Sequence, residues 1–218
     1  MNWTGNDVHS DLREACVAEA TAIIAEAGVE ALSLREVARR LGVSHQAPYR
    51  HFESRDHVLA EVVRRAYVRF AHALGRAPQT GNARTDALAM GMAYVSFALT
   101  HPLEYRLMFG GALPLPSAHP EMMNGAREAF AVLQRTIEGL FAARGQAIVK
   151  SDIDRESLFV WSSLHGVVSL LRSDALNTLE LDDDARQQLV AHSLRKIGMA
   201  LGIVPLTDDA GPAGGGAQ

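Results

Sequence analysis

Residues 33 to 59 read SLREVARRLGVSHQAPYRHFESRDHVL, and this stretch carries the clearest structural pattern of the chain. Ser33 is a good helix N-cap, and Glu36 three residues later completes the sequence pattern of a capping box. Apolar side chains then recur at the spacing of one helix face: Leu34, Val37, Ala38 and Leu41. Gly42 follows where a helix commonly ends in a left-handed residue. The pattern predicts a short helix followed by a tight turn.

A second short helix is expected directly after that turn. Val43 supplies an apolar plug for the turn, and Ser44 is predicted to cap the next helix. Ser54 is predicted to cap a third, much longer helix that runs to Leu74. Two short helices around a glycine-containing turn are typical of a helix-turn-helix, whose second helix enters the major groove of DNA.

The charge of this region is consistent with a nucleic-acid partner. Between Ser33 and Phe70 there are eight arginines and four carboxylates, which leaves +4 in a chain whose formal net charge is −4. A local basic patch is expected of a protein that binds phosphates. The alternative is a solvated helix surface with ordinary ion pairs, and charge alone does not choose between the two.

The stretch resembles the DNA-binding domain of the TetR family of bacterial repressors. The pattern A-x-x-L-G-V-S-x-x-x-x-Y-x-H-F-x-S-R-D, from Ala38 to Asp56, lines up without a gap. One departure is Pro48, where a leucine is commoner. Because proline removes an amide donor and biases Ala47 away from helical angles, we expect the recognition helix to start irregularly.

The resemblance implies roles for individual residues. Arg35 matches a position that can reach a base edge, and an arginine fork suits guanine. In the exposed opening of the recognition helix, Gln46 could pair with adenine and Ala47 could touch the thymine methyl group, with His45 beside them. Five residues match positions that hold phosphates: Ser33, Ser44, Tyr49, His51 and Arg55. For Tyr49 and His51 the alternative is packing within the small domain. We also include Arg50 of the basic patch, and we assign Phe52 to the core.

The composition of the whole chain excludes several classes of protein. With 218 residues, of which 48% are hydrophobic, the chain can bury a sizeable core. It lacks a run of about 18 apolar residues, and its N-terminus does not have the order of a signal peptide. Its single cysteine, Cys16, excludes an internal disulfide and is expected to be a buried thiol. We therefore expect a soluble, cytoplasmic protein without a membrane partner.

Helical periodicity continues over nearly the whole length, without strand-like alternation or internal repeats. Helices are predicted over residues 11–27, 54–74, 86–100, 103–109, 126–144, 154–176 and 182–201. This pattern predicts an all-α fold. We expect an N-terminal arm and helix-turn-helix domain (1–53), a connecting helix (54–75), a helical regulatory and dimerisation domain (76–204) and a disordered, low-complexity tail (205–218).

The second half resembles one branch of the TetR family more narrowly. The matching segments are AYV from Ala93, HPLEYRLMFG from His101, and WSSLHG from Trp161. The branch is named for a Trp, His-Gly signature, which Trp161, His165 and Gly166 would supply. Together the two resemblances cover roughly residues 11–201, and they imply a DNA-binding regulator with a ligand-sensing C-terminal domain.

Aromatic and methionine side chains of the second half are candidates for lining an effector pocket. The candidates are Met90, Tyr94, Phe97, Tyr105, Met108, Phe109, Phe130, Trp161 and His165. Residues of this kind at helical spacing are more often plain core. Trp161 and His165 share one helix face, where they could offer a stacking surface beside a polar handle, although His165 could equally be a core histidine.

A stripe of small residues suggests a dimer contact. Ser162, Gly166, Ser169 and Ser173 follow each other at i, i+4, i+7 and i+11, which would permit close approach of another helix. The following helix offers Leu189, Leu194 and Ile197. The alternative is an ordinary central helix in a monomer. We favour the homodimer, because one short recognition helix binds DNA weakly alone.

No catalytic motif or metal-ligand spacing is present, so the sequence predicts neither an enzyme nor a cofactor. The combined expectation is a homodimeric TetR-type repressor that binds a pseudo-palindromic double-stranded operator. A small apolar or amphipathic effector would release it. Two alternatives are a DNA-binding regulator without ligand control and, less in keeping with the sequence, a helical enzyme.

Overall fold

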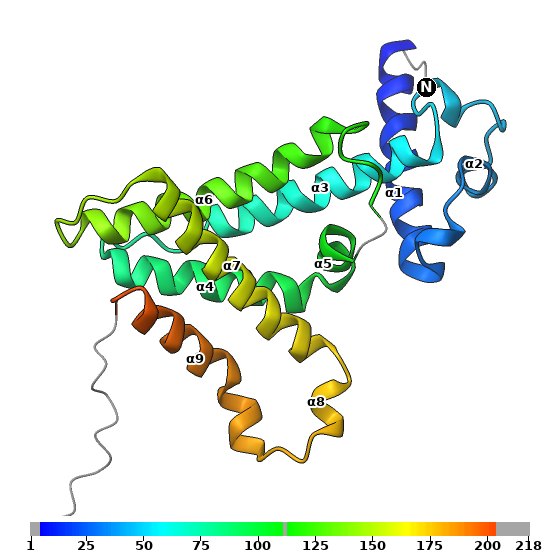
Figure 1. The fold of residues 1–218 in the computed structure, drawn as a ribbon. Coiled ribbons are helices and arrows are strands. Elements are labelled where there is room, and N and C mark those ends of the chain that lie inside the picture. The colour runs from blue at the N-terminus through cyan, green and yellow to red at the C-terminus, as the bar shows by residue number, and fades with distance from the viewer. Residues whose placement is uncertain (1–4, 111–112, 204–218) are drawn as a thin grey trace, which may run out of the picture. The chain divides into compact units, whose positions relative to one another are not determined.

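The computed structural model describes residues 5–110 and 113–203, and its regular elements there are all helices (Figure 1). The α-helices are α1 (Gly5–Ala27), α2 (Leu34–Leu41), α3 (Arg55–Gly75), α4 (Ala83–Thr100), α5 (Pro102–Phe109), α6 (Asn124–Ala142), α7 (Lys150–Arg172), α8 (Ala175–Thr178) and α9 (Asp183–Ala200). Short 3₁₀ helices are η1 (Val29–Ala31), η2 (Pro48–Arg50) and η3 (Pro120–Met123). The predicted all-α fold is confirmed.

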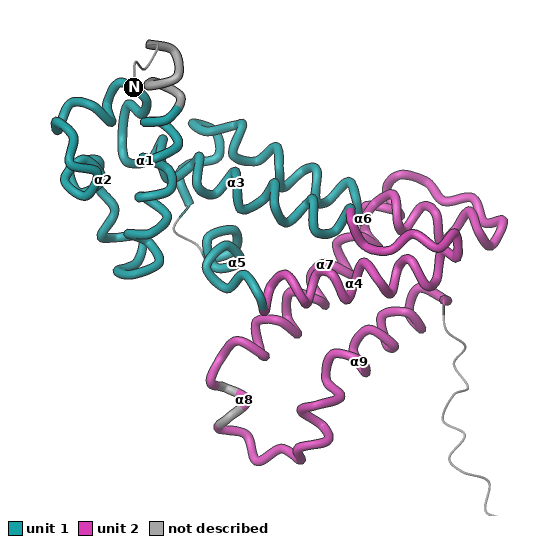
Figure 2. Tube along the Cα trace, turned by 180° about the vertical axis from the view of Figure 1, so that it is seen from behind, with its two compact units in different colours: residues 1–75, 100–132 teal, residues 76–99, 133–218 magenta. Residues whose placement is uncertain are grey.

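The chain forms two compact units (Figure 2). Unit 1 comprises residues 1–75 and 100–132, and unit 2 comprises residues 76–99 and 133–218. Helix α6 is continuous across the division, since its first nine residues belong to unit 1 and the remainder to unit 2.

In unit 1, helices α1, α2 and α3 pack around a small apolar core. Helix α1 contacts both α2 and α3. The side chains between them include Ile23, Ile24, Val37, Val58 and Leu59, all of which are buried. Cys16 is also fully buried, as predicted, and burial raises the pKa of its thiol. Gly42 ends α2 with φ of 66°, a left-handed conformation in which its N–H reaches the carbonyls of Ala38 and Arg39.

The later segments of unit 1 pack along α3: the residues around η3 lie near its first half, where the rings of His119 and His57 are 4.8 Å apart, and α5 lies near its second half. Helices α5 and η3 both contact α3. The Tyr67 hydroxyl donates a hydrogen bond to the Met108 carbonyl at 2.8 Å. Gly125, at the start of α6, lies so close to α3 that a Cβ atom there would come within 2.7 Å of the Tyr67 Cβ. A glycine is therefore required at this contact.

Unit 2 is built from α4, the second part of α6, α7 and α9. Helix α7 packs against α9. The buried side chains are aliphatic or methionine for the most part, and include Met90, Ile137, Leu140, Leu164 and Val168.

Two details differ from the expectations, and one prediction falls outside the described residues. Helix α1 begins at Gly5, so residues 5–10 are helical rather than a loose arm. The predicted helix over 154–176 is interrupted: Ser173 is extended, and its hydroxyl donates to the Leu170 carbonyl, an interaction that competes with the helix. The predicted tail, residues 205–218, lies outside the described residues.

Candidate functional site

The predicted capping box at the start of α2 is only half formed. The Ser33 hydroxyl accepts a hydrogen bond from the Glu36 N–H at 3.1 Å, as expected of an N-cap. The Glu36 carboxylate instead accepts hydrogen bonds from Arg39 and Arg40, at distances of 2.6 to 3.0 Å. Each of these bonds joins two opposite charges, whereas a bond from the Ser33 amide to the Glu36 carboxylate would involve only one charge. The bonds from the two arginines lower the pKa of Glu36 to about 2.

The segment predicted as the recognition helix is a tight turn followed by the 3₁₀ helix η2, and Ser44 does not cap an α-helix. The Ala47 N–H donates to the Ser44 carbonyl, and the Arg50 N–H donates to the Ala47 carbonyl. Pro48 explains this i→i+3 pattern, because it has no N–H to donate to Ser44, as residue 48 would in an α-helix. The expected effect on Ala47 is wrong, however, since its angles, φ −61° and ψ −48°, are helical.

This segment presents polar side chains to solvent. Ser44, His45, Gln46, Tyr49 and Arg50 are exposed, and Ala47 is half-buried. Arg35 is exposed on α2. Phe52 is buried, as predicted, with the Arg13 guanidinium 5.3 Å above its ring. The structure therefore brings the predicted base-reading residues to the surface of unit 1.

Most arginines of the basic patch are paired with carboxylates inside unit 1. Arg40 reaches Glu36, Glu19 and Glu26, at 2.8 to 3.4 Å. Further pairs join Arg39 to Glu36, Arg64 to Glu61, Arg65 to Glu61 and Glu14, and Arg69 to Glu104. Within the described ranges, Arg35 and Arg50 alone among the eight have no carboxylate partner.

Three of the five predicted phosphate-binding residues have contacts within unit 1: Ser33, whose hydroxyl is described above, Arg55 and His51. The Arg55 guanidinium donates to the carbonyls of Leu32 and Val29, at 3.1 and 2.8 Å, and pairs with Asp56. It thereby fastens the connection between α1 and α2 to the start of α3. His51 is half-buried and lines a cavity of about 350 Å³ with Phe52 and His57.

The nine predicted effector contacts are distributed over both units. Tyr105, Met108, Phe109 and Phe130 belong to unit 1. There the Phe109 ring contacts the rings of Tyr105, Tyr67 and Phe70, with centroids 4.7 to 6.4 Å apart. Met90, Tyr94, Phe97, Trp161 and His165 belong to unit 2. His165 is half-buried, which lowers its pKa, and its Nε2 lies 3.4 Å from the Ser169 hydroxyl.

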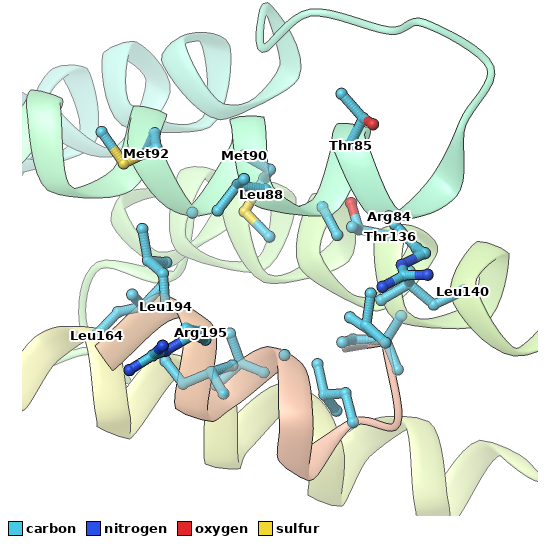
Figure 3. Close-up of a pocket in the computed structure, with 18 of the residues that line it drawn as sticks. Arg84, Thr85, Leu88, Met90, Met92, Thr136, Leu140, Leu164, Leu194 and Arg195 are labelled. Carbon is cyan, nitrogen blue, oxygen red and sulfur yellow. The ribbon is translucent and has the colours of Figure 1, made fainter. Parts of the chain in front are cut away.

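Unit 2 contains a cavity of about 540 Å³ between α4, α6, α7 and α9 (Figure 3). Met90 is the one predicted effector contact that lines it. Sequence reasoning missed the other lining residues, which include Arg84, Thr85, Leu88, Thr136, Leu140 and Arg195. A leucine at helical spacing gives no signal that distinguishes a cavity wall from a filled core.

The predicted dimer residues fall into two groups. Ser162, Gly166, Ser169 and Ser173 are all exposed, and no atom would meet a Cβ at Gly166 within 4 Å. Leu194 and Ile197, by contrast, are buried within unit 2 and line its cavity, while Leu189 is half-buried. Large apolar residues Leu158, Phe159 and Leu170 are exposed on α7 beside the small ones.

Residues 5–110 and 113–203 contain neither a metal-binding cluster nor a membrane-spanning helix. His, Cys, Asp and Glu side chains are nowhere grouped there in a way that could hold a metal ion. None of the helices in these ranges is both long and apolar enough to cross a membrane.

Comparison with known proteins gives matches in both halves. The family model described as "Bacterial regulatory proteins, tetR family" matches residues 17–62. The model described as "Tetracyclin repressor-like, C-terminal domain" matches residues 87–195, half of the chain. Among curated proteins, HTH-type transcriptional regulator Rv1816 of Mycobacterium tuberculosis is 32% identical over 129 residues. That match covers 58% of this chain and 53% of the relative, so the chain spans about half of the relative's length.

Solved structures of other proteins share the fold of this chain over most of its length. A protein of unknown function from Rhodococcus sp. RHA1 is 28% identical with a TM-score of 0.73, covering 87% of this chain and 94% of that one. A bacterial regulatory protein in the tetR family from Rhodococcus RHA1 shares the fold, with 21% identity, a TM-score of 0.62 and coverage of 88% and 96%.

An all-helical chain with an N-terminal helix-turn-helix and a larger helical C-terminal part defines a class of transcriptional regulators rather than enzymes. With models matching both halves, the chain belongs to the TetR family.

Proposed function

We propose that the chain is a ligand-responsive repressor that binds a pseudo-palindromic DNA operator as a homodimer. It would act in the cytoplasm. The observation that carries the proposal is the exposed surface formed by Arg35 and residues 44–50, where two arginines lack carboxylate partners among the residues that the structure describes. Phosphates and guanine edges are the groups that such unpaired guanidinium groups bind best.

Within this surface we propose separate roles for residues that read bases and residues that hold phosphates. Arg35 and Gln46 are assigned to base edges, with His45 and Ala47 beside them. Tyr49, Arg50 and Ser44 are assigned to phosphates, which fix register without reading sequence. Ser33, His51 and Arg55 remain candidates for phosphate contacts, although Ser33 and Arg55 also hold the domain together.

The homodimer is supported by the exposed face of α7. Leu158, Phe159 and Leu170 leave large apolar surface in water beside the small residues Ser162 and Gly166. Burial of that face against a second copy would remove it from water. Because Leu194 and Ile197 are buried in their own unit, we centre the proposed interface on α7. A dimer also places two recognition segments on two operator half-sites.

Ligand control is supported by the cavity of unit 2, whose volume of about 540 Å³ falls in the range typical of small-molecule sites. An effector there would favour a conformer in which the two recognition segments no longer match the half-site spacing. The Trp161, His165 and Gly166 signature supports assignment of the C-terminal domain to the Trp, His-Gly branch.

A screen of genomic DNA fragments tests the proposal. The purified chain should retain a small set of fragments, beginning with DNA next to its own gene. Affinity for those fragments should fall with salt with a log–log slope on the order of −4 to −8 for two subunits. A folded sample that shows no sequence-preferring, salt-sensitive binding would refute DNA recognition. Binding that no small molecule alters would favour a regulator without ligand control.

A further inference from the structure

Unit 2 contains two adjoining cavities of contrasting character. The first, of about 540 Å³, has almost entirely apolar walls from α4, α6, α7 and α9 (Figure 3). The second, of about 340 Å³, lies between residues 81–84, the end of α6 and residues 202–203. Arg84, Leu140 and Ile203 line both, so the two spaces meet at these residues.

The charges that line the two cavities are all positive. They are Arg84, Arg144 and Arg195, and among the described residues neither lining contains an aspartate or a glutamate. Within the described residues, the Arg84 side chain has no ion-pair partner. Arg144 donates to the Leu201 carbonyl and lies over the Phe141 ring at 4.5 Å, and neither contact neutralises its charge. An anion would.

The nearest acidic residue in the sequence does not serve as a counter-charge. Asp86 stands two residues after Arg84 in the first turn of α4, and it lines neither cavity. Its carboxylate accepts hydrogen bonds from the N–H and hydroxyl of Thr80 and from the Gly81 N–H, at 2.7 to 3.2 Å. The Asp86 carboxylate is therefore occupied by the turn that precedes α4, and the arginines of the two cavities remain available to an anionic ligand.

Figure 3 shows an arginine toward each end of the first cavity: Arg84 lies with Thr136 and Leu140 at one end, and Arg195 lies with Leu164 at the other. Arg195 lies on α9, where its guanidinium is 3.3 Å from His192. The lining contains no aromatic side chain on which a planar molecule could stack. A flexible aliphatic body suits such walls better than a ring system.

We infer that this site binds an anionic amphiphile, with its oxyanion head between Arg84 and Arg144 and a single aliphatic chain between α4 and α9. The inference rests on the proposed ligand control, because it names the class of effector. The head would receive charge-assisted hydrogen bonds, which are the strongest available to a carboxylate, sulfate or phosphate. The chain would displace water from the apolar walls.

Calorimetric titration of the full chain, without DNA, tests the class of ligand. The probes are decanoate, decanol and decyltrimethylammonium, each used below the concentration at which it aggregates. These molecules share the tail length and differ in head charge. The affinity for decanoate should exceed that for decanol by a factor of about ten or more, and decyltrimethylammonium should bind most weakly. Equal affinity for decanoate and decanol, or tighter binding of the cation, would overturn the inference.

Two substitutions locate the head. Arg84→Gln and Arg144→Gln should each weaken decanoate binding by roughly tenfold to a hundredfold and leave decanol unaffected. Arg84 makes no side-chain hydrogen bond in the described structure, so its variant should fold even if Arg144→Gln does not. Arg135→Gln, an exposed arginine of α6 outside both linings, is the matched control and should change nothing. If Arg195→Gln removes the preference for decanoate over decanol and Arg84→Gln does not, the oxyanion head lies at the Arg195 end of the cavity and the proposed placement is wrong.

A second pair of variants locates the tail. Ala87 lines the apolar cavity, whereas Ala89, two residues along the same helix and also half-buried, does not. Ala87→Phe should fill the cavity and weaken decanoate and decanol alike, and Ala89→Phe should weaken neither. The reverse result would place the tail elsewhere.

Failure of this inference can be distinguished from failure of the proposed function. Sequence-preferring DNA binding by a chain that ignores decanoate would refute the ligand class and leave the DNA-binding regulator standing. Tight, arginine-dependent decanoate binding by a chain that binds no DNA would confirm the site and refute the regulator.

Discussion

Arg35 and Arg39 lie four residues apart on α2 and are both exposed, yet they differ in what surrounds them. The Arg39 guanidinium donates to Glu36 at 2.6 and 2.8 Å. Arg35 has no such partner among the described residues. A carboxylate that already occupies the guanidinium competes with phosphate or a base, so we assign DNA recognition to Arg35 alone of the pair.

Arg35→Ala should therefore relax base preference, by about 1–3 kcal/mol if the contact with guanine is bidentate. Arg39→Ala is the matched control and should leave base preference unchanged. The measurement is affinity for the selected operator and for random duplexes of equal length. If Arg35→Ala lowers both affinities by the same factor, Arg35 holds a phosphate and reads no base.

The difference between these two arginines shows what the sequence could predict at the scale of single residues. The excess of arginine over acid in residues 33–70 was visible in the sequence. The pair Glu36–Arg39 lies at the local i,i+3 spacing of a helix. The pairs of Arg40 with Glu19 and Glu26 and of Arg65 with Glu14, up to 51 residues away, were not visible. Contacts across such separations depend on how α1 packs, which local periodicity does not specify.

At the scale of elements, prediction succeeded where the signal is local. The end of α2 at Gly42 follows from one glycine in a left-handed conformation. The recognition segment, residues 44–50, shows the limit of such local prediction. The helix-turn-helix pattern predicted an α-helix there, whereas Pro48 leads to turns and the 3₁₀ helix η2. The family resemblance identified the irregular position. The conformation that resulted depends on the packing of the buried proline ring.

Gly42→Ala should destabilise the protein by about 1–2 kcal/mol, because an L-residue is strained at φ of 66°. No atom would lie within 4 Å of the added Cβ, so the cost is conformational and not steric. Gly75→Ala, at the end of α3, also meets open space but lacks a positive φ, and should be neutral or slightly stabilising. Urea unfolding of the two variants checks the contrast, and equal effects would contradict it.

Glu61 joins α1 to α3 in unit 1. It is buried, and it accepts hydrogen bonds from Arg64 and Arg65 at 2.7 to 2.9 Å, with Arg13 of α1 at 3.5 Å. Burial by itself would raise the pKa of Glu61, but the arginine hydrogen bonds outweigh it and lower the pKa to about 2. The folded state therefore holds this carboxylate ionised at a pH where the unfolded chain would protonate it.

The sign of the resulting pH dependence follows. Since the folded pKa lies below the ordinary value of 4.5, the stabilisation is present above about pH 4.5 and is lost as the pH falls toward 2. It amounts to roughly 3 kcal/mol. Glu61→Gln should lower the free energy of unfolding at pH 7 and flatten its decline in acid. Glu36→Gln, at a more exposed carboxylate with similar partners, should have a smaller effect. Urea unfolding at pH 7, 4.5 and 3 tests this, and equal losses would contradict it.

At the scale of the whole molecule, the sequence predicted the kind of C-terminal domain better than the position of its cavity. Aromatic residues were chosen as cavity walls because they commonly line ligand sites. In the structure Tyr105 is buried in unit 1, where the half-buried Phe109 packs against it, Tyr67 and Phe70, while the cavity of unit 2 is lined mainly by aliphatic residues. Which side chains leave a void depends on the packing of whole helices, and no pattern along the chain encodes it.

Binding to both operator half-sites depends on the proposed dimer, and a substitution at Gly166 tests that dimer. Gly166 lies near the middle of α7, where glycine costs about 1 kcal/mol relative to alanine, and its surroundings are open within the single chain. Close approach of a second copy's helix would explain a glycine there. Gly166→Leu should then separate the two helices, with overpacking of about 1–3 kcal/mol that occurs twice because of the two-fold axis.

The variant should sediment as a monomer, keep its helical circular dichroism and lose most of its operator affinity, because its recognition segments are no longer joined. Gly139→Leu is the matched control, since Gly139 is also exposed on a helix of unit 2 with no atom within 4 Å of an added Cβ, but lies on α6. It should remain a dimer with full affinity. A Gly166→Leu protein that stays dimeric and binds its operator normally would show that the chains associate through a different face, and the exposed Leu158, Phe159 and Leu170 would then need another partner.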